Sequence, residues 1–231
     1  MYDLRHVVQL LVAAAALNMT WSVETAAADT YHADWRFEVL LNDKSIGFHS
    51  FSLTGDAERQ ILSTEAQFDV RFLFVNAFRY RHDNTEIWGN GCLDNINATT
   101  DKNGDFLTVR GQRSGDRFLL EGQPAEPLPG ECIQTFAYWN PDILDSSRLL
   151  NSQTGELEEV SVTRESLDAI DINGQSVEAV RYRLRTKSGV ITLWYSNDES
   201  RRWLALEAPA RGGQTLRYVP VQIPAADDLL A

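Results

Sequence analysis

Apolar and polar residues alternate along most of the chain with a period of two, which is typical of β-strands that bury one face. The clearest run covers residues 62–74, where every second residue is apolar or threonine and the residues between them are polar as far as Arg71. Asn103-Gly104 and Asn173-Gly174 favour tight hairpin turns, because Asn and Gly accept a positive φ. The predicted strands are 35–41, 46–53, 62–74, 78–88, 93–100, 105–111, 167–172, 175–186, 189–196, 203–208 and 214–219.

About eleven or twelve strands with turns every ~8–12 residues predict an all-β antiparallel fold. One short helix is predicted over residues 141–150, with Asn140 as its N-cap and Pro141 at its first position. Its apolar side would consist of Ile143, Leu144, Leu149 and Leu150. A single helix in a long antiparallel sheet favours a strongly curved sheet or half-open β-barrel with the helix as a plug or lid, although a closed barrel also fits.

Residues 1–28 have the features of a secretory signal peptide. The apolar stretch Val7–Leu17 precedes Ala26-Ala27-Ala28, which is a small-residue cleavage site. The alternative is an uncleaved anchor, but this stretch is too short to span about 30 Å of hydrocarbon. We therefore expect cleavage after Ala28 and a periplasmic or secreted protein, with a single β domain over 29–222 and a flexible C-terminal tail over 223–231.

Composition and charge narrow the class of protein. The 231 residues are 43% hydrophobic and 23% charged, as expected of a folded globular chain rather than a disordered or fibrous one. The net charge of −12 repels phosphate groups, so we do not expect nucleic acid or anionic lipid as a primary partner. Beyond the N-terminal segment no stretch approaches about 18 apolar residues, so we expect no membrane span in the mature chain.

Cys92 and Cys132 are the two cysteines of the chain. Export places them in an oxidising compartment, which predicts one disulfide between them. One alternative is a catalytic thiol, which would have to stay reduced there. Another is a zinc site, for which two cysteines and three mature histidines lack the usual spacing. We expect no metal and no cofactor.

The predicted strand 78–88 carries the most informative side chains. If the strand is regular, its aromatic residues lie on one face together with a histidine, an asparagine and a glutamate. This face would ordinarily be the inner one, where the polar groups need partners or a ligand. The predicted ligand-binding residues are Tyr80, His82, Asn84, Glu86 and Trp88. The alternative is that the polar members pair with one another or face solvent at a strand end.

Catalytic chemistry has weaker support, because the chain has no nucleophile elbow, phosphate-binding loop or zinc-protease motif. The candidate general bases are His49, His82 and Glu86. With a two-residue turn at Asp43-Lys44, His49 would lie opposite Glu38, either as an oriented base or as an ordinary cross-strand pair. A shared metal ion is excluded on a regular strand, because His82 and Glu86 would lie about 13 Å apart.

Several motifs resemble those of one known family. They are Trp35-x-Phe37-x-Val39, Ile46-Gly47-Phe48-His49, Glu86-x-Trp88 with Gly91-Cys92-Leu93, Thr135-Phe136-Ala137-Tyr138-Trp139, Leu149-Leu150-Asn151 with Gln153-Thr154-Gly155-Glu156, and Leu193-Trp194-Tyr195. Over residues 33–219 the chain is similar to an uncharacterised family of exported bacterial proteins, a domain of unknown function. The resemblance implies a bacterial periplasmic protein with a curved antiparallel sheet. It brings no established activity and no site residue.

Three functions follow as hypotheses. The favoured one is a non-enzymatic binding module for a hydrophobic or lipid-like ligand of the bacterial envelope, with His82, Asn84 and Glu86 fixing the polar end of the ligand. The second is a hydrolase or lyase that uses a histidine general base. The third is an interaction module that docks an envelope protein through exposed sheet edges or aromatic residues.

Overall fold

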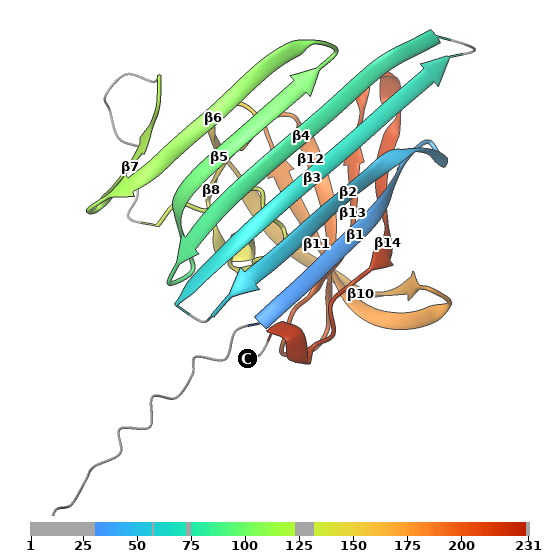
Figure 1. Ribbon diagram of the computed structural model, residues 1–231. Helices are drawn as coiled ribbons and strands as arrows, with labels where there is room; N and C mark the ends of the chain where they lie inside the picture. The colour runs from blue at the N-terminus through green and yellow to red at the C-terminus, as the bar shows by residue number, and fades with distance from the viewer. Residues whose placement is uncertain (1–30, 57, 73–74, 123–131, 230–231) are drawn as a thin grey trace, which may run out of the picture.

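The computed structural model describes residues 31–56, 58–72, 75–122 and 132–229. They form a 12-stranded antiparallel sheet in the order β10-β11-β12-β13-β14-β1-β2-β3-β4-β5-β6-β7 and a 2-stranded sheet of β8 and β9 (Figure 1). The strands of the large sheet are β1 (Tyr31–Leu41), β2 (Lys44–Gly55), β3 (Arg59–Phe72), β4 (Val75–Gly89), β5 (Cys92–Lys102), β6 (Asp105–Ser114), β7 (Arg117–Leu120), β10 (Ser161–Ile172), β11 (Gln175–Thr186), β12 (Gly189–Ser196), β13 (Trp203–Pro209) and β14 (Thr215–Gln222). The predicted all-β antiparallel class is confirmed, and the predicted signal peptide lies outside the described residues.

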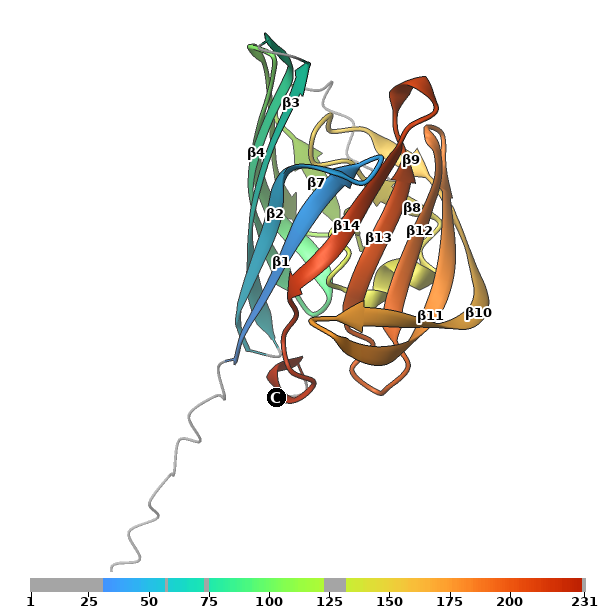
Figure 2. The same ribbon diagram turned by 90° about the vertical axis from the view of Figure 1, so that its right-hand side faces the viewer.

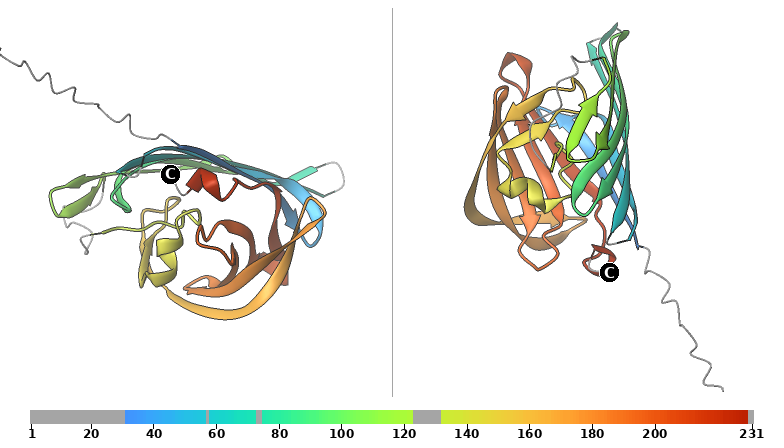
Figure 3. Two further views of the ribbon diagram at one scale, coloured as in Figure 1. Left: turned by 90° about the horizontal axis from the view of Figure 1, so that it is seen from below. Right: turned by 90° about the vertical axis from the view of Figure 1, so that its left-hand side faces the viewer.

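The large sheet curves into a half-open barrel. Figure 2 shows β2–β4 in one wall and β11–β13 in the other, and Figure 3 shows from below how the sheet bends around the chain segment between them. Within the described residues, β7 and β10 are the two edges of the sheet and do not pair with each other. Residues 132–160, here called the inner segment, lie on the open side of the barrel. They contain the 3-10 helix η1 (Pro141–Asp145), β8 (Arg148–Leu150) and β9 (Leu157–Glu159).

A cluster of large aromatic residues closes one end of the barrel. Trp35, Trp88 and Trp203 are almost completely buried, and the ring centroids of Phe37 and Trp203 lie 4.3 Å apart. Burial of each large apolar side chain contributes about 1.5–3 kcal/mol. The alternating pattern of the strands thus places these large side chains in one common hydrophobic core.

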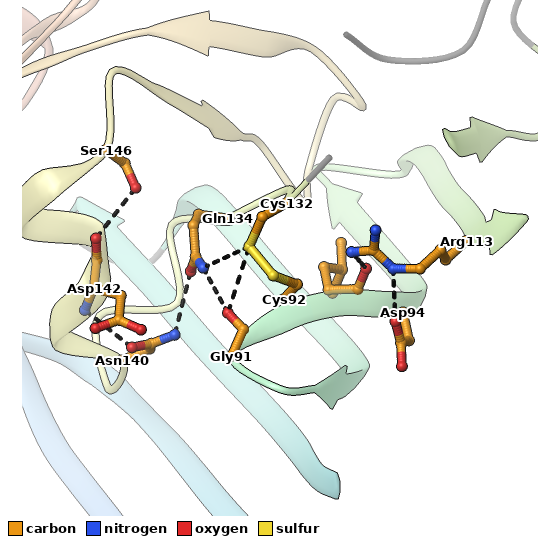
Figure 4. Close-up of a disulfide and its surroundings, with 10 residues drawn as sticks. Gly91, Cys92, Asp94, Arg113, Cys132, Gln134, Asn140, Asp142 and Ser146 are labelled. Atoms are coloured by element: carbon orange, nitrogen blue, oxygen red, sulfur yellow. Dashed lines mark hydrogen bonds and ion pairs between the residues drawn. A yellow bond between two sulfur atoms is a disulfide. The ribbon is translucent and has the colours of Figure 1, made fainter. Parts of the chain in front are cut away.

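A disulfide attaches the inner segment to the sheet. Cys92, at the start of β5, is bonded to Cys132 as predicted, with 5.0 Å between the two Cα atoms (Figure 4). Beside this bond, Gln134 Nε2 donates a hydrogen bond of 2.6 Å to the backbone carbonyl of Gly91. The amide oxygen of Gln134 in turn accepts a hydrogen bond of 3.2 Å from Asn140 Nδ2. The segment is thus held to the β4–β5 turn by one covalent bond and a short chain of amides.

The structure corrects the extent of the predicted helix. Pro141–Asp145 is a 3-10 helix that begins at Asn140, whose side chain caps it as predicted. It ends at Ser146, whose backbone is extended. The next residues form β8, which pairs with β9 and buries both of its leucines, so these leucines belong to a strand and not to the apolar side of a longer helix.

The turn between β1 and β2 corrects the predicted register. Asn42 and Asp43 occupy the two turn positions with φ of 47° and 64°, values that Asn and Asp tolerate. The turn therefore lies one residue earlier than predicted, and a bulge near the end of β1 shifts the pairing again. As a result, His49 pairs with Phe37, and the predicted pairing of His49 with Glu38 is wrong. Glu38 is exposed on the outer face of β1.

The chain beyond β14 lies against the barrel as far as it is described. Ile223 and Leu229 are partly buried against the core, and Arg202 Nη1 donates a hydrogen bond of 3.0 Å to the backbone carbonyl of Pro224. Two further 3-10 helices, η2 (Arg211–Gly213) and η3 (Asp227–Leu229), complete the described secondary structure. Among all the residues that the structure describes, no helix is long and apolar enough to cross a membrane.

Candidate functional site

A cavity of about 760 Å³ lies on the concave side of the sheet. Strands β1–β5, strands β11–β14 and the inner segment each contribute part of its wall. The apolar members of the wall are Leu41, Ile46, Phe51, Leu62, Phe68, Val70, Phe78, Phe136, Ala137, Ile191, Leu206, Ala208, Pro209, Ala210 and Leu216. The volume falls within the range of about 300–1,000 Å³ that is usual for small-molecule sites.

Cross-strand pairing arranges the wall in rows between an open and a closed end. Across β2, β3 and β4 these rows are His49–Ala66–His82, Phe51–Thr64–Asn84 and Leu53–Leu62–Glu86. The exposed side chains of Lys102 and Arg211 line the mouth, and Figure 2 shows the β13–β14 connection, which includes Arg211, at the top of the barrel. Glu86 is only 1% exposed at the other end. From Phe78 to Glu86, β4 follows the cavity for about 27 Å.

Glu86 lies at the closed end and accepts three hydrogen bonds. Its Oε1 accepts from Asn84 Nδ2 over 2.9 Å, and its Oε2 accepts from Trp88 Nε1 and from Thr135 Oγ1 over 3.1 Å each. Burial raises the pKa of Glu86 to about 7, although all three donors favour the ionised form and lower the pKa. The Glu86 carboxyl group therefore changes its charge close to neutral pH.

His82 lies between two hydroxyl groups. Its Nδ1 is 2.9 Å from Thr100 Oγ1 on β5, and its Nε2 is 3.5 Å from Ser152 Oγ on the inner segment. Burial lowers the pKa of His82 to about 4, because desolvation disfavours the charged imidazolium. At neutral pH this side chain is consequently an uncharged hydrogen-bonding group.

His49 occupies the same row as His82. Its Nδ1 is 3.0 Å from the hydroxyl of Tyr218, and its ring lies against Phe51 with 4.1 Å between the centroids. Burial, with a smaller contribution from nearby His82, lowers the pKa of His49 well below 6.5. His49 Nε2 and Asn84 Oδ1 are both buried without a hydrogen-bond partner among the described residues. Buried polar atoms in native proteins usually have a partner, so these two atoms are free to form further hydrogen bonds inside the cavity.

Three tyrosines add phenol groups to the wall: Tyr80 on β4, Tyr138 on the inner segment and Tyr218 on β14. Burial raises the pKa of each phenol well above 10, so each stays protonated at neutral pH. Together with the two uncharged histidines they give the middle of the cavity a polar surface that carries no charge.

The structure places four of the five predicted ligand-binding residues in the cavity wall, namely Tyr80, His82, Asn84 and Glu86. Trp88 lies outside the wall, where it is fully buried and donates its hydrogen bond to Glu86. All three candidate bases, including His49, line the cavity.

Sequence reasoning missed the wall residues Tyr138, Ser152 and Tyr218. Tyr218 follows the alternation of its strand, but no local pattern shows that β14 pairs with β1 beside the cavity. Tyr138 and Ser152 lie in the inner segment, which has no strand periodicity that would indicate their direction. Among the described residues, no group of three or more His, Cys, Asp or Glu side chains is placed to hold a metal ion.

The fold and the cavity together define an open β-barrel protein with an internal cavity whose wall combines apolar side chains with polar groups in its middle and at its closed end. The chain belongs to the family DUF6134, a domain of unknown function, whose family model matches residues 37–221. This match confirms the resemblance to an uncharacterised family.

The structure is also similar to the crystal structure of a β-barrel-like protein of the domain of unknown function DUF1849 from Brucella abortus. The TM-score is 0.61 at 10% sequence identity, and the match covers 86% of this chain and 99% of that one. At this identity the likeness concerns the fold alone. No curated protein matches the chain in sequence.

Proposed function

We propose that this protein is a non-enzymatic binding module for a hydrophobic or lipid-like ligand of the bacterial envelope. The observation that carries the proposal is the elongated cavity, whose wall is mostly apolar and whose unpartnered polar atoms belong to His49 and Asn84. An apolar ligand would remove the wall from water, and a polar end on that ligand would supply hydrogen bonds to the buried atoms. The features of a signal peptide in residues 1–28 support a site of action outside the cytoplasm.

Binding of N-phenylnaphthylamine, an uncharged dye that fluoresces in apolar sites, tests this proposal. The mature protein should increase the fluorescence of the dye saturably, with one dye molecule per chain. Ala208→Trp introduces an indole into the cavity wall and should weaken binding at least about tenfold, because the indole occupies the space that the dye needs. Equal unfolding transitions would show that the variant is folded.

Glu207→Trp is the matched control for this experiment. Glu207 is the neighbour of Ala208 on β13 and faces outward, where its carboxylate lies 3.5 Å from Arg217 Nε. This variant should bind the dye as the unmodified protein does. Absence of saturable binding, or an equal loss in both tryptophan variants, would contradict the proposal.

A hydrolase is the second candidate, and one observation favours it. The His82 ring lies between two hydroxyl groups, those of Ser152 and Thr100. In this arrangement Ser152 could be the nucleophile, His82 the base that takes its proton, and Thr100 the group that orients the imidazole. Thr100 cannot neutralise an imidazolium as a carboxylate would, and burial lowers the pKa of His82, so the base would be weak.

Hydrolysis of p-nitrophenyl laurate tests this second candidate. Ser152→Ala and His82→Gln should each reduce the rate by about 10²–10⁴ if this arrangement is catalytic. A rate that is indistinguishable from that of buffer, or that both variants retain, would exclude it.

A further inference from the structure

We infer that the cavity selects ligands whose polar end is an uncharged hydrogen-bond donor, such as an alcohol or an amide, and that this end lies toward the closed end of the barrel. The inference rests on the proposed binding function and specifies the chemistry of the ligand and its orientation. Three observations carry it: the order of apolar and polar rows along the cavity, the identity of the unpartnered atoms, and the position of the charged side chains.

The order of the rows sets the orientation. Toward the mouth the wall carries apolar side chains, among them Val70, Phe78 and Leu216, and the exposed side chains of Lys102 and Arg211 lie at the rim. Farther in follow the two histidines, and Asn84 lies one row deeper than they do. A ligand with its alkyl tail toward the mouth and its polar end inward matches this order. The reverse orientation would place an alkyl tail against His49 Nε2 and Asn84 Oδ1 and leave both atoms unpaired, which is costly for buried polar groups.

The unpartnered atoms require a donor. Asn84 Oδ1 can only accept a hydrogen bond, because an amide oxygen carries no hydrogen. The amide nitrogen of the same side chain donates to Glu86, which fixes the orientation of the amide. His49 Nε2 is either a donor or an acceptor, depending on which ring nitrogen faces Tyr218 as N–H. A hydroxyl group has one hydrogen to donate and can also accept, so it satisfies Asn84 Oδ1 together with the His49 tautomer that donates from Nε2. A primary amide has two N–H groups, so it also satisfies the tautomer in which Nε2 accepts. A carboxylate accepts only and would oppose the Asn84 oxygen.

The charged side chains of the wall disfavour an anionic polar end. Lys102 and Arg211 are the basic residues of the wall, and both are exposed at the mouth. Farther in, the ionisable acids are Glu86 and Glu158, so a carboxylate or phosphate would be buried beside like charges and without a cation. Pairing of an anion with Lys102 or Arg211 at the exposed mouth would contribute little, because water screens such pairs.

A cationic polar end also lacks a suitable partner. The two oxygens of Glu86 already accept three hydrogen bonds from the protein, and Glu158 Oε1 accepts one of 2.8 Å from Asn151 Nδ2. The two histidines that face the middle of the cavity are hydrogen-bonded by Tyr218 and by Thr100, which are uncharged. An ammonium group placed between the two histidines would therefore lose its hydration without pairing directly with a carboxylate.

Displacement of N-phenylnaphthylamine by four competitors with the same tail tests the inference. Dodecanol, dodecanoic acid, dodecylamine and dodecane differ only in the polar end, and at pH 8 the acid and the amine are charged. Dodecanol should displace the dye at a concentration at least about tenfold lower than any of the other three. Equal or stronger displacement by the acid, the amine or dodecane would overturn the inference and leave the binding function standing. Failure of the dye itself to bind would contradict the binding function.

The variant His49→Phe tests whether the His49 ring forms a hydrogen bond with the polar end of the ligand. Phenylalanine keeps the ring in the wall and removes its nitrogens, so the preference for dodecanol over dodecane should fall about threefold or more. Dye affinity should change little. His32→Phe is the matched control, because His32 is exposed on β1 away from the cavity and should leave the preference intact. An unchanged preference in folded His49→Phe would overturn the role given to His49.

Discussion

Glu86 and His82 are buried titratable residues on which the same physical effect acts in opposite directions. Removal from water favours the uncharged form of each, so burial raises the pKa of the Glu86 carboxyl to about 7 and lowers the pKa of the His82 imidazole to about 4. Their contributions to folding therefore depend on pH with opposite sign. Single substitutions separate the two contributions.

The unfolding free energy of the Glu86→Gln variant should increase relative to that of the unmodified protein as the pH rises from 4.5 to 7. In the unfolded chain the Glu86 carboxyl ionises near pH 4.5, whereas the folded protein holds its proton until about pH 7. The unmodified protein thus loses about 3 kcal/mol of unfolding free energy across this window. Urea denaturation of both proteins at several pH values measures the difference. A difference that stays constant with pH would contradict the burial of an acidic Glu86.

His82→Gln should show the opposite trend at lower pH. The unfolded imidazole gains a proton below pH 6.5, whereas folded His82 stays neutral to about pH 4, so stability is lost as the pH falls through this range. The unmodified protein should lose about 3 kcal/mol relative to the variant between these values. His32→Gln, at an exposed position, is the control and should follow the unmodified protein. Parallel curves for all three proteins would rule out a buried neutral His82.

At the scale of elements, the strands could be predicted because a half-buried strand needs an apolar residue at every second position. The same rule predicted which face of β4 carries Tyr80, His82, Asn84 and Glu86. The β1–β2 register could not be derived, because Asn42-Asp43-Lys44-Ser45 permits a tight turn at more than one position. The inner segment has no strand or helix periodicity, so the sequence could not predict which of its side chains line the cavity.

The inner segment should depend on the disulfide more than the sheet does. Cys92 and Cys132 close a loop with a sequence separation of 40, for which chain entropy predicts about 4 kcal/mol of stabilisation. Replacement of both cysteines by alanine should lower the unfolding free energy by up to this amount. In this variant the rates of amide hydrogen exchange should increase most in residues 132–160, while β2–β4 stay protected. Equal acceleration throughout the sheet would contradict a local role for the disulfide.

At the scale of the whole molecule, the half-open barrel explains why a large sheet can hold a cavity in place of a fully packed core. The aromatic cluster fills one end, the inner segment covers the open side, and the mouth remains at the ends of β5 and β13. The fold class was predictable from the strand count, and the inner face of β4 predicted a ligand site, but the size of the cavity was not predictable. It depends on the distance between two walls that are far apart in sequence.

Expression of the full chain in a Gram-negative host tests the predicted export. The intact mass of the periplasmic protein should correspond to residues 29–231 less two hydrogen atoms, which reports both cleavage after Ala28 and the bond between Cys92 and Cys132. A cytoplasmic protein that retains residues 1–28 would contradict the predicted signal peptide.

Native mass spectrometry of the same periplasmic protein tests the central claim, that the cavity holds an apolar ligand, most directly. We expect a second species heavier by one small molecule, which an organic extract releases and identifies. Ala208→Trp should lose this species, and Glu207→Trp should keep it. Repeated preparations of the unmodified protein that contain only the bare chain, and that also fail to bind N-phenylnaphthylamine, would contradict the claim.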